Sequence, residues 1–464
     1  MNASEKGVIQ DCPRAITLRE AFPIWCRVAA LSFGGPAGQI AVMHRILVDE
    51  KRWISEERFL HALNYCMLLP GPEAQQLATY IGWLMYRAVG GLMAGVLFVL
   101  PGCLAILGLS ILYAQYRDVA IVAAVFFGLK PAVMAIVFEA VQRIGKRVLK
   151  NGATLTIAAA AFVAIFFFDV PFPAVIATAA AIGFVGGRAA PQYFAVGQGH
   201  GKAGGDSPST RPTVAILHDD VQPSLYRAVV VSAICLILWF GPLVAIAVLF
   251  GRESTYWHEG IFFSKAAVVT FGGAYSVLAY VAQQAVERYG WLMPGEMLDG
   301  LGMAETTPGP LIMVVQFVGF LGAYRNPGPL DPLAAGVLGS LVTTWVTFVP
   351  CFYWIFLGAP YIERLRGNRL LGSALSAITA AVVGVILNLA VWFALHVLFA
   401  SVVERRFAGV RVLVPEWTTL NIAAAAIAIL ACGLTFCWKR GMAVTLATCA
   451  AVGAMIYLAW PGAR

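Results

Sequence analysis

Long apolar segments, separated by short polar ones, run through the whole chain. Segments such as 228–250 and 374–400 are long enough to cross about 30 Å of hydrocarbon as single helices. Backbone groups in lipid must be satisfied internally, so segments of this length are expected to be helices rather than barrel strands. The pattern predicts an all-α polytopic membrane protein with spans near 22–43, 62–86, 89–115, 120–142, 154–168, 171–186, 225–250, 261–285, 298–323, 333–357, 372–399, 417–437 and 441–460.

The number of crossings depends on the short pair 154–168 and 171–186, which Asp169-Val170-Pro171 divides. Helices this short either cross the bilayer or form re-entrant or interfacial segments. We therefore expect about 12–13 transmembrane helices.

One stretch of the chain recurs at a constant offset. Residues 29–72 align without a gap on 267–310, and twelve of the 44 positions are identical. Each copy carries a Phe-Gly-Gly and, further on, a Pro-Gly-Pro. If every predicted span crosses, seven crossings separate the copies, and an odd number makes the two repeats inverted; counting the short pair as one crossing would reverse this. Two inverted, Gly- and Pro-broken units are typical of a transporter with its binding site between the halves.

The polar segments suggest how the chain is organised. Residues 1–20 form a polar tail without the apolar core of a cleaved signal peptide, and 187–222 form a flexible linker rich in Gly, Ser and Pro. We expect a first repeat at 21–186 and a second at 223–464, which starts with one extra helix at 225–250.

Composition supports the membrane assignment and excludes several functions. Apolar residues make up 60% of the chain and charged residues 12%, against roughly 45–50% and 25% in soluble proteins. The net charge of +8 comes without a basic run interleaved with aromatics, so we expect no nucleic-acid partner. Lys and Arg favour a cytoplasmic N-terminus. We expect no metal, cofactor or enzymatic activity, because the sequence contains no CxxC pair, His cluster, ATP-binding loop or dinucleotide motif.

The paired glycines Gly34-Gly35 and Gly272-Gly273 lie inside predicted spans. Each glycine weakens a helix by about 1 kcal/mol relative to alanine. One interpretation is a broken helix whose free N–H groups bind an anion; the other is close helix packing. Recurrence at matched positions favours the broken helix.

The Pro70-Gly71-Pro72 and Pro308-Gly309-Pro310 motifs are stronger helix breaks, because each removes two N–H donors. Irregular backbone at membrane depth is tolerated when it is buried in protein or lines a cavity. The alternative is a turn at the membrane interface.

Three basic residues are candidates for binding the anion. Arg27 and Lys265 occupy matched positions six residues before the two phenylalanines, and Lys130 lies deeper in another span. A charge at mid-bilayer costs about 2.5–3.5 kcal/mol on insertion scales. Snorkelling to headgroups is the alternative for Arg27 and Lys265.

Three glutamates are candidates for carrying a coupling proton: Glu73, Glu139 and Glu305. Burial shifts carboxyl groups towards the protonated form at neutral pH. A structural ion pair or a helix cap is an equally good interpretation of each, and Glu139 is spaced to meet Arg143 four residues on.

The motifs resemble those of the chromate ion transporter family, in its long, two-domain form. In the first half the resemblance rests on Leu31–Gln39 and Leu63–Gln76, and in the second on Thr270–Tyr275, Gly302–Leu311 and Ala380–Asn388. It covers nearly the whole chain apart from the first twenty residues and the linker.

The resemblance implies a secondary transporter that exports chromate across the bacterial inner membrane and confers chromate resistance. Chromate and sulfate share shape and charge, so sulfate is a potential competitor, and uptake or exchange of sulfate or another oxyanion is the first alternative. A membrane-bound chromate reductase is the alternative from another class. A homodimer in the lipid bilayer is compatible with the sequence.

Overall fold

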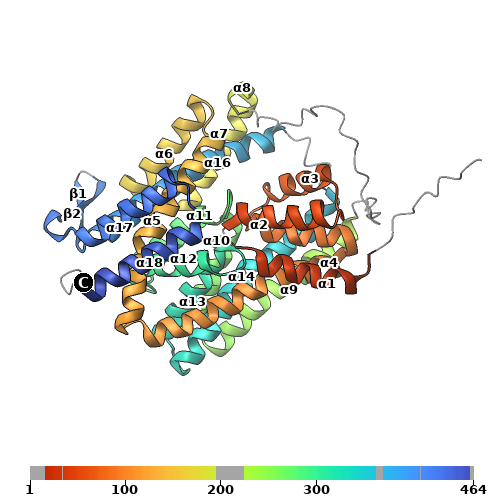
Figure 1. Ribbon diagram of the computed structural model, residues 1–464. Helices are drawn as coiled ribbons and strands as arrows, with labels where there is room; N and C mark the ends of the chain where they lie inside the picture. The colour runs from red at the N-terminus through yellow and green to blue at the C-terminus, as the bar shows by residue number, and fades with distance from the viewer. Residues whose placement is uncertain (1–15, 34, 195–223, 362–368, 408, 460–464) are drawn as a thin grey trace, which may run out of the picture.

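The computed structural model describes residues 16–33, 35–194, 224–361, 369–407 and 409–459, and it is helical throughout except for one β-hairpin (Figure 1). The elements up to residue 194 are α1 (Leu18–Leu31), α2 (Gly35–His44), the π-helical η1 (Arg45–Glu50), α3 (Glu56–Cys66), α4 (Glu73–Tyr116), α5 (Ala120–Val148), α6 (Gly152–Phe168), α7 (Phe172–Ala189) and α8 (Pro191–Phe194).

The later elements begin with α9 (Leu225–Leu249), the expected extra helix. The others are α10 (Thr255–Val269), α11 (Ala274–Gln283), the π-helical η2 (Gln284–Arg288), α12 (Glu296–Thr306), η3 (Leu311–Met313), α13 (Val314–Arg325), α14 (Pro332–Gly358), η4 (Ala359–Tyr361), α16 (Arg369–Leu398), β1 (Val402–Phe407), β2 (Val410–Pro415), η5 (Trp417–Thr419), α17 (Ile422–Cys432), the π-helical η6 (Gly433–Cys437) and α18 (Met442–Ala459).

The described chain has seven helices that are long and apolar enough to cross a membrane, and three shorter apolar helices accompany them. The seven are α4, α5, α7, α9, α14 with η4, α16 and α18. Several predicted spans, such as 22–43 and 261–285, contain two helices with a break between them. The chain is therefore an all-α, multi-pass membrane protein with broken helices.

The order of elements repeats with the sequence. At the offset of 238 residues α1 corresponds to α10, α2 to α11, η1 to η2 and α3 to α12. Further on, α4 contains non-helical dihedrals at Tyr86 and Arg87, which divide it into two helices. Its first part corresponds to α13 and its second part to α14.

Two equivalent helices run in opposite directions. A methyl group at Gly91 in α4 would meet Phe356 of α14, and one at Gly95 would meet Phe352. The residue number rises along one helix as it falls along the other, so the second part of α4 and α14 are antiparallel neighbours. Equivalent helices that cross in opposite directions are the geometry of inverted repeats.

Long helices of each repeat pack against helices of the other repeat. In Figure 1, α16 lies beside α6 and α7, while α17 and α18 lie beside α5. Close contacts at equivalent positions support these packings: Gly453 meets Gly128, and Gly183 meets Ala377. Small residues let the helix backbones approach closely where lipid offers no hydrophobic driving force.

The sequence reasoning missed the β-hairpin at one end of the molecule. Its strands pair antiparallel, with Val403 opposite Val414. Arg411 on β2 is buried and contacts three carboxylates: Glu287 at 2.8 Å, Asp169 at 3.1 Å and Glu404 at 3.1 Å.

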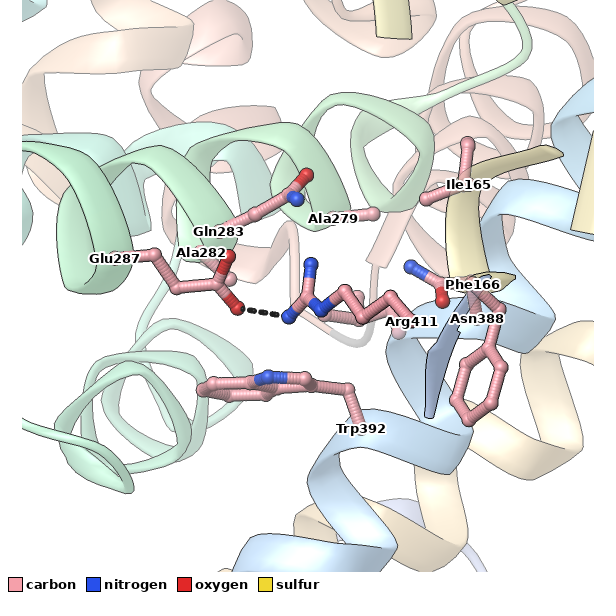
Figure 2. A pocket seen from close by; sticks show the side chains of 10 residues that line it. Ile165, Phe166, Ala279, Ala282, Gln283, Glu287, Asn388, Trp392 and Arg411 are labelled. Carbon is pink, nitrogen blue, oxygen red and sulfur yellow. Dashed lines mark hydrogen bonds and ion pairs between the residues drawn. The ribbon is translucent and has the colours of Figure 1, made fainter. Parts of the chain in front are cut away.

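The same arginine lines a hollow between α6, α11 with η2, and α16. Figure 2 shows its guanidinium pointing to Glu287, with Gln283 on one side and Trp392 and Asn388 on the other. Asp169 ends α6, and its carboxylate also accepts a hydrogen bond from Gln283. Arg411 therefore joins the α6–α7 turn, the π-helical η2 and the hairpin.

Helices extend past two of the expected domain boundaries. The first residues of the expected linker 187–222 are helical, because α7 continues to Ala189 and α8 follows; residues 195–222 lie outside the described part. Likewise, α1 begins at Leu18, inside the expected tail 1–20. Thr17 and Glu20 form a capping box there, which satisfies N–H groups at the start of the helix.

We predict that Arg411→Met loosens the hairpin. It leaves three carboxylates together without their shared cation, which should cost about 2 kcal/mol. Hydrogen exchange across 402–415 should accelerate, and the unfolding temperature in detergent should fall. Arg405→Met, on the exposed face of β1, is the control and should change neither; equal exchange rates in both variants would contradict the joining role.

Candidate functional site

The first helix of each repeat ends at an equivalent residue with the same local bond. The Ser32 hydroxyl donates to the Val28 carbonyl at 2.6 Å, and the Thr270 hydroxyl donates to the Ala266 carbonyl at 2.6 Å. The backbone then turns sharply, and the next helix begins three to four residues later.

Left-handed backbone at the turns explains the paired glycines. Gly272 and Gly273 have φ values of 75° and 95°, and Gly35 has 72°. This region favours glycine because a Cβ is strained there. Nothing lies within 4 Å of a Cβ at Gly35 or Gly273, so the backbone conformation, rather than close packing, requires those two glycines. Gly34 lies outside the described residues.

The two Pro-Gly-Pro motifs break the chain a second time. Their glycines have φ values of 127° at Gly71 and 100° at Gly309. Both motifs are at the junction of two helices: α3 with α4 in the first repeat, and α12 with η3 and α13 in the second. Both glycines are buried, so this irregular backbone lies inside the protein, where it is tolerated at membrane depth.

The breaks of one repeat bind to those of the other. The Gly71 amide donates to the Thr270 carbonyl at 2.8 Å, and the Gly309 amide donates to the Ser32 carbonyl at 2.9 Å. The two bonds are equivalent under the 238-residue offset. Each Pro-Gly-Pro therefore binds the end of a helix in the opposite repeat, and the four breaks form two such pairs, which we together call the crossing.

Two glutamine side chains of the first repeat reinforce the crossing. The Gln39 amide donates to the Gly309 carbonyl at 2.6 Å, and the Gln76 amide donates to the Pro70 carbonyl at 2.7 Å. A Cβ on Gly309 would lie 3.0 Å from the Cα of Gly102, and one on Gly71 would lie 2.9 Å from the Cys351 sulfur.

The candidate proton carriers gather beside one helix near the crossing. Glu305 is buried and accepts a hydrogen bond from the Tyr275 hydroxyl, while its second oxygen has no hydrogen-bond partner among the described residues. The charges of Arg143 and Glu139 on α5 act on this pair. Arg143 itself contacts Glu139 at 3.9 Å, which is the i, i+4 pair predicted from the sequence.

Arg147 lies one turn further along α5. It contacts the first repeat at the position equivalent to the one on which Arg143 acts in the second repeat. It contacts the sulfur of Met67 at 3.7 Å, and Met67 is the counterpart of Glu305. Its charge also acts on Glu73, the first residue of α4. All three predicted carboxylates thus lie within electrostatic reach of Arg143 or Arg147. The sequence reasoning missed Arg147, although its i, i+4 spacing from Arg143 was a usable signal.

Lys130 pairs with a carboxylate that was not a candidate proton carrier. Its ammonium lies 3.4 Å from Asp299, which is buried and also accepts a hydrogen bond from Tyr113 at 2.9 Å. At the start of α12, Glu296 binds Arg325 through both oxygens, at 2.7 and 2.8 Å, and Arg117 as well. These charges join α4, α5, α12 and α13.

The matched cations differ in their surroundings. Arg27 is about half exposed and binds Glu50 at 2.7 Å. Lys265 is exposed on α10 and has no ion pair with any residue that the structure describes. Each lies five residues before the carbonyl that binds the opposite Pro-Gly-Pro, so the two cations occupy equivalent places relative to the crossing. The structure does not bring them into contact with each other.

The described residues contain no group of three or more His, Cys, Asp or Glu side chains that could hold a metal ion. The crossing instead offers backbone amides at the starts of α2 and α11. Free amides at helix starts bind anions, and guanidinium or ammonium groups strengthen such binding.

Comparison with known proteins identifies the family. Residues 19–184 and 257–454 match the family model described as Chromate transporter, and together they make up most of the chain. The chain belongs to the chromate transporter family. A chromate transport protein of Pseudomonas aeruginosa is 31% identical over 379 residues, 81% of this chain and 80% of that protein.

Other relatives of the chromate transporter family agree with this. A chromate transport protein of Cupriavidus metallidurans is 28% identical over 380 residues, 82% of this chain and 83% of that protein. A probable chromate transport protein of Synechococcus elongatus is 25% identical over 383 residues, 80% of this chain and 83% of that protein. No solved structure matches the chain significantly.

We predict that Gly309→Ala destabilises the crossing. A side chain at a φ of 100° is strained, and its Cβ would press on Gly102, at a cost of about 1–3 kcal/mol. The unfolding temperature in detergent should fall. Gly108→Ala, where a Cβ meets nothing within 4 Å in the helical part of α4, should be neutral or stabilising; equal effects at both sites would contradict the prediction.

A double-mutant cycle tests the Lys130–Asp299 pair. Lys130→Met leaves a buried carboxylate without its cation and should cost about 3 kcal/mol. Adding Asp299→Asn removes that unpaired charge, so the double variant should recover part of the loss. Thermal unfolding of the four proteins measures the coupling; additive effects would show that the two groups do not interact.

Proposed function

We propose that the protein is a secondary active transporter that exports chromate across the bacterial inner membrane and thereby confers chromate resistance. Membership of the chromate transporter family and the names of its relatives support chromate as the substrate. The reciprocal backbone bonds at the crossing are the observation that supports the transport mechanism, because each joins a break of one repeat to a break of the other, as expected of two inverted repeats.

Chromate is a tetrahedral dianion, and the crossing has the groups that bind one. Backbone amides of the second helices, at Gly35 and Gly273, would receive its oxygens. Lys265 is the cation best placed to bind it in this conformation, because it has no carboxylate partner among the described residues. Arg27 and Lys130 would have to exchange Glu50 and Asp299 for the substrate.

That exchange suggests how protonation is coupled to binding of the dianion, whose export the inside-negative membrane potential would then drive. Glu73, Glu139 and Glu305 share the two arginines of α5, so the arginines carry more free positive charge when these carboxylates are protonated. Protonation would therefore favour binding of the dianion, and deprotonation its release. Glu305 is the most strongly buried of the three, which makes it the first choice as proton carrier.

We place residues 21–186 and 223–464 as the two transport repeats, with the linker between them and the N-terminus in the cytoplasm. The excess of Lys and Arg in the segments that would then be cytoplasmic supports this orientation.

Sulfate uptake or exchange is the alternative within transport, because sulfate has the same shape and charge. A membrane-bound chromate reductase is the alternative outside it. The relatives' names, which are those of transport proteins, favour transport over reduction.

Flux through proteoliposomes tests the proposal. Purified protein should move labelled chromate when a pH gradient or a membrane potential is imposed, well above empty liposomes. Excess sulfate distinguishes the oxyanions, since complete inhibition would favour a sulfate transporter. Chromate consumed without net flux would indicate a reductase, and neither flux nor consumption would contradict the proposal.

Substitution of the matched cations tests the site. Lys265→Ala and Arg27→Ala should each abolish chromate flux while the protein still inserts and purifies as a folded species. Arg188→Ala is the control, since Arg188 is exposed at the end of α7 and packs on Phe184, away from the crossing. Normal transport by both cation variants would rule out the paired-cation site.

A further inference from the structure

Glu259 on α10 is a buried carboxylate that the anion site does not use. Its side chain is fully inaccessible, and neither oxygen has a side-chain hydrogen-bond partner among the described residues, although the backbone of Ala323 acts on the carboxylate. An ionised carboxylate without a partner is very costly in such a place, so the neutral acid is the favoured form.

Two glycines from the facing helices make room for this carboxylate. A Cβ at Gly322 of α13 would come within 2.7 Å of one Glu259 oxygen, and a Cβ at Gly339 of α14 within 2.7 Å of the other. Trp291 lies against the same Gly322. The carboxyl group therefore occupies a notch between α13 and α14, and any side chain at either glycine would displace it.

The notch holds little else that carries charge. On α10 itself, Tyr256 interacts electrostatically with Glu259, but its hydroxyl donates to the Pro327 carbonyl. The cation of the adjacent turn, Arg325, binds Glu296 and the Trp291 carbonyl. No base or cation among the described residues forms an ion pair with Glu259 in this conformation.

The notch is mechanically linked to the crossing. Glu259 lies eleven residues before Thr270, or about 16 Å along α10. On the opposite wall, α13 follows directly from Pro308-Gly309-Pro310 and carries Gly322 near its far end. A helix moves as a rigid element, so a shift at the break that admits the anion also moves the wall that encloses Glu259.

We propose that Glu259 is a proton-binding site, which holds a proton while the notch is closed and releases it to water when α13 and α14 separate. The step is a simple proton transfer: a carboxylate takes a proton from water on one side and returns it on the other. This inference rests on the proposed function, because it adds a second proton-binding group, besides Glu305, to the coupling of that transporter. It also makes coupling asymmetric, since the equivalent residue of the first repeat is the buried Ala21.

Glu259→Gln tests the proposal with little risk to the fold, because the amide resembles the neutral acid in size. Infrared spectra at neutral pH should show a protonated carboxyl band in the wild type and in Glu253→Gln, an exposed control just before α10. That band should lose intensity in Glu259→Gln, because the other buried carboxyl groups remain. Retention of the full band in Glu259→Gln would overturn the proposal, whether or not the protein transports chromate.

The flux experiment tests the coupling itself. In Glu259→Gln, chromate flux driven by a pH gradient should fall to the level seen without a gradient, and proton movement should cease, whereas Glu253→Gln should behave as wild type. Glu259→Asp, which keeps the acid, should retain partial coupling. Full pH-driven flux in Glu259→Gln would overturn the proposal. A wild type without any flux would instead contradict the proposed function, and the infrared result would still decide whether Glu259 binds a proton.

Discussion

Two backbone hydrogen bonds hold the repeats together at the crossing: Gly71 to Thr270 and Gly309 to Ser32. Each bond gives a partner to a carbonyl that the end of a helix would otherwise leave unsatisfied in the membrane. Neither repeat can make its bond alone, because donor and acceptor come from different copies. Each break therefore takes this bond from the other repeat, and the positive φ values of Gly71 and Gly309 favour glycine at both donor positions.

The symmetry of the backbone contrasts with the asymmetry of the charges. The helix ends, π-helical segments and breaks recur in both repeats, yet Glu305 corresponds to Met67 and Glu259 to Ala21. The buried carboxylates are concentrated in the second repeat, while Arg143, which acts on Glu305, lies on α5 of the first. A duplicated backbone can thus contribute to a site from both repeats while most of the protonatable side chains lie in one repeat.

Much of the fold could be predicted from the sequence, because hydrophobic length and a repeated motif are properties of the chain itself. The apolar segments and the recurring breaks identified the helices and the positions where they end. The β-hairpin was missed because its stability depends on Arg411, whose carboxylate partners include Asp169, 242 residues away. No local sequence pattern predicts a strand pair whose stability depends on tertiary contacts.

The sequence allowed prediction of which residues belong to the candidate site, but not of which residues each of them contacts. Sequence spacing selected Arg27 and Lys265 as a matched pair, yet only the structure shows that Arg27 is balanced by Glu50 while Lys265 has no ion pair with a described residue. Glu259 was passed over because nothing in its local sequence distinguishes a buried carboxylate from an exposed one. Its significance comes from Gly322 and Gly339, which are more than sixty residues away and leave space that a carboxyl group fills. The space available between helices, and not the residue type, therefore distinguishes a glutamate that can bind and release a proton from a structural one.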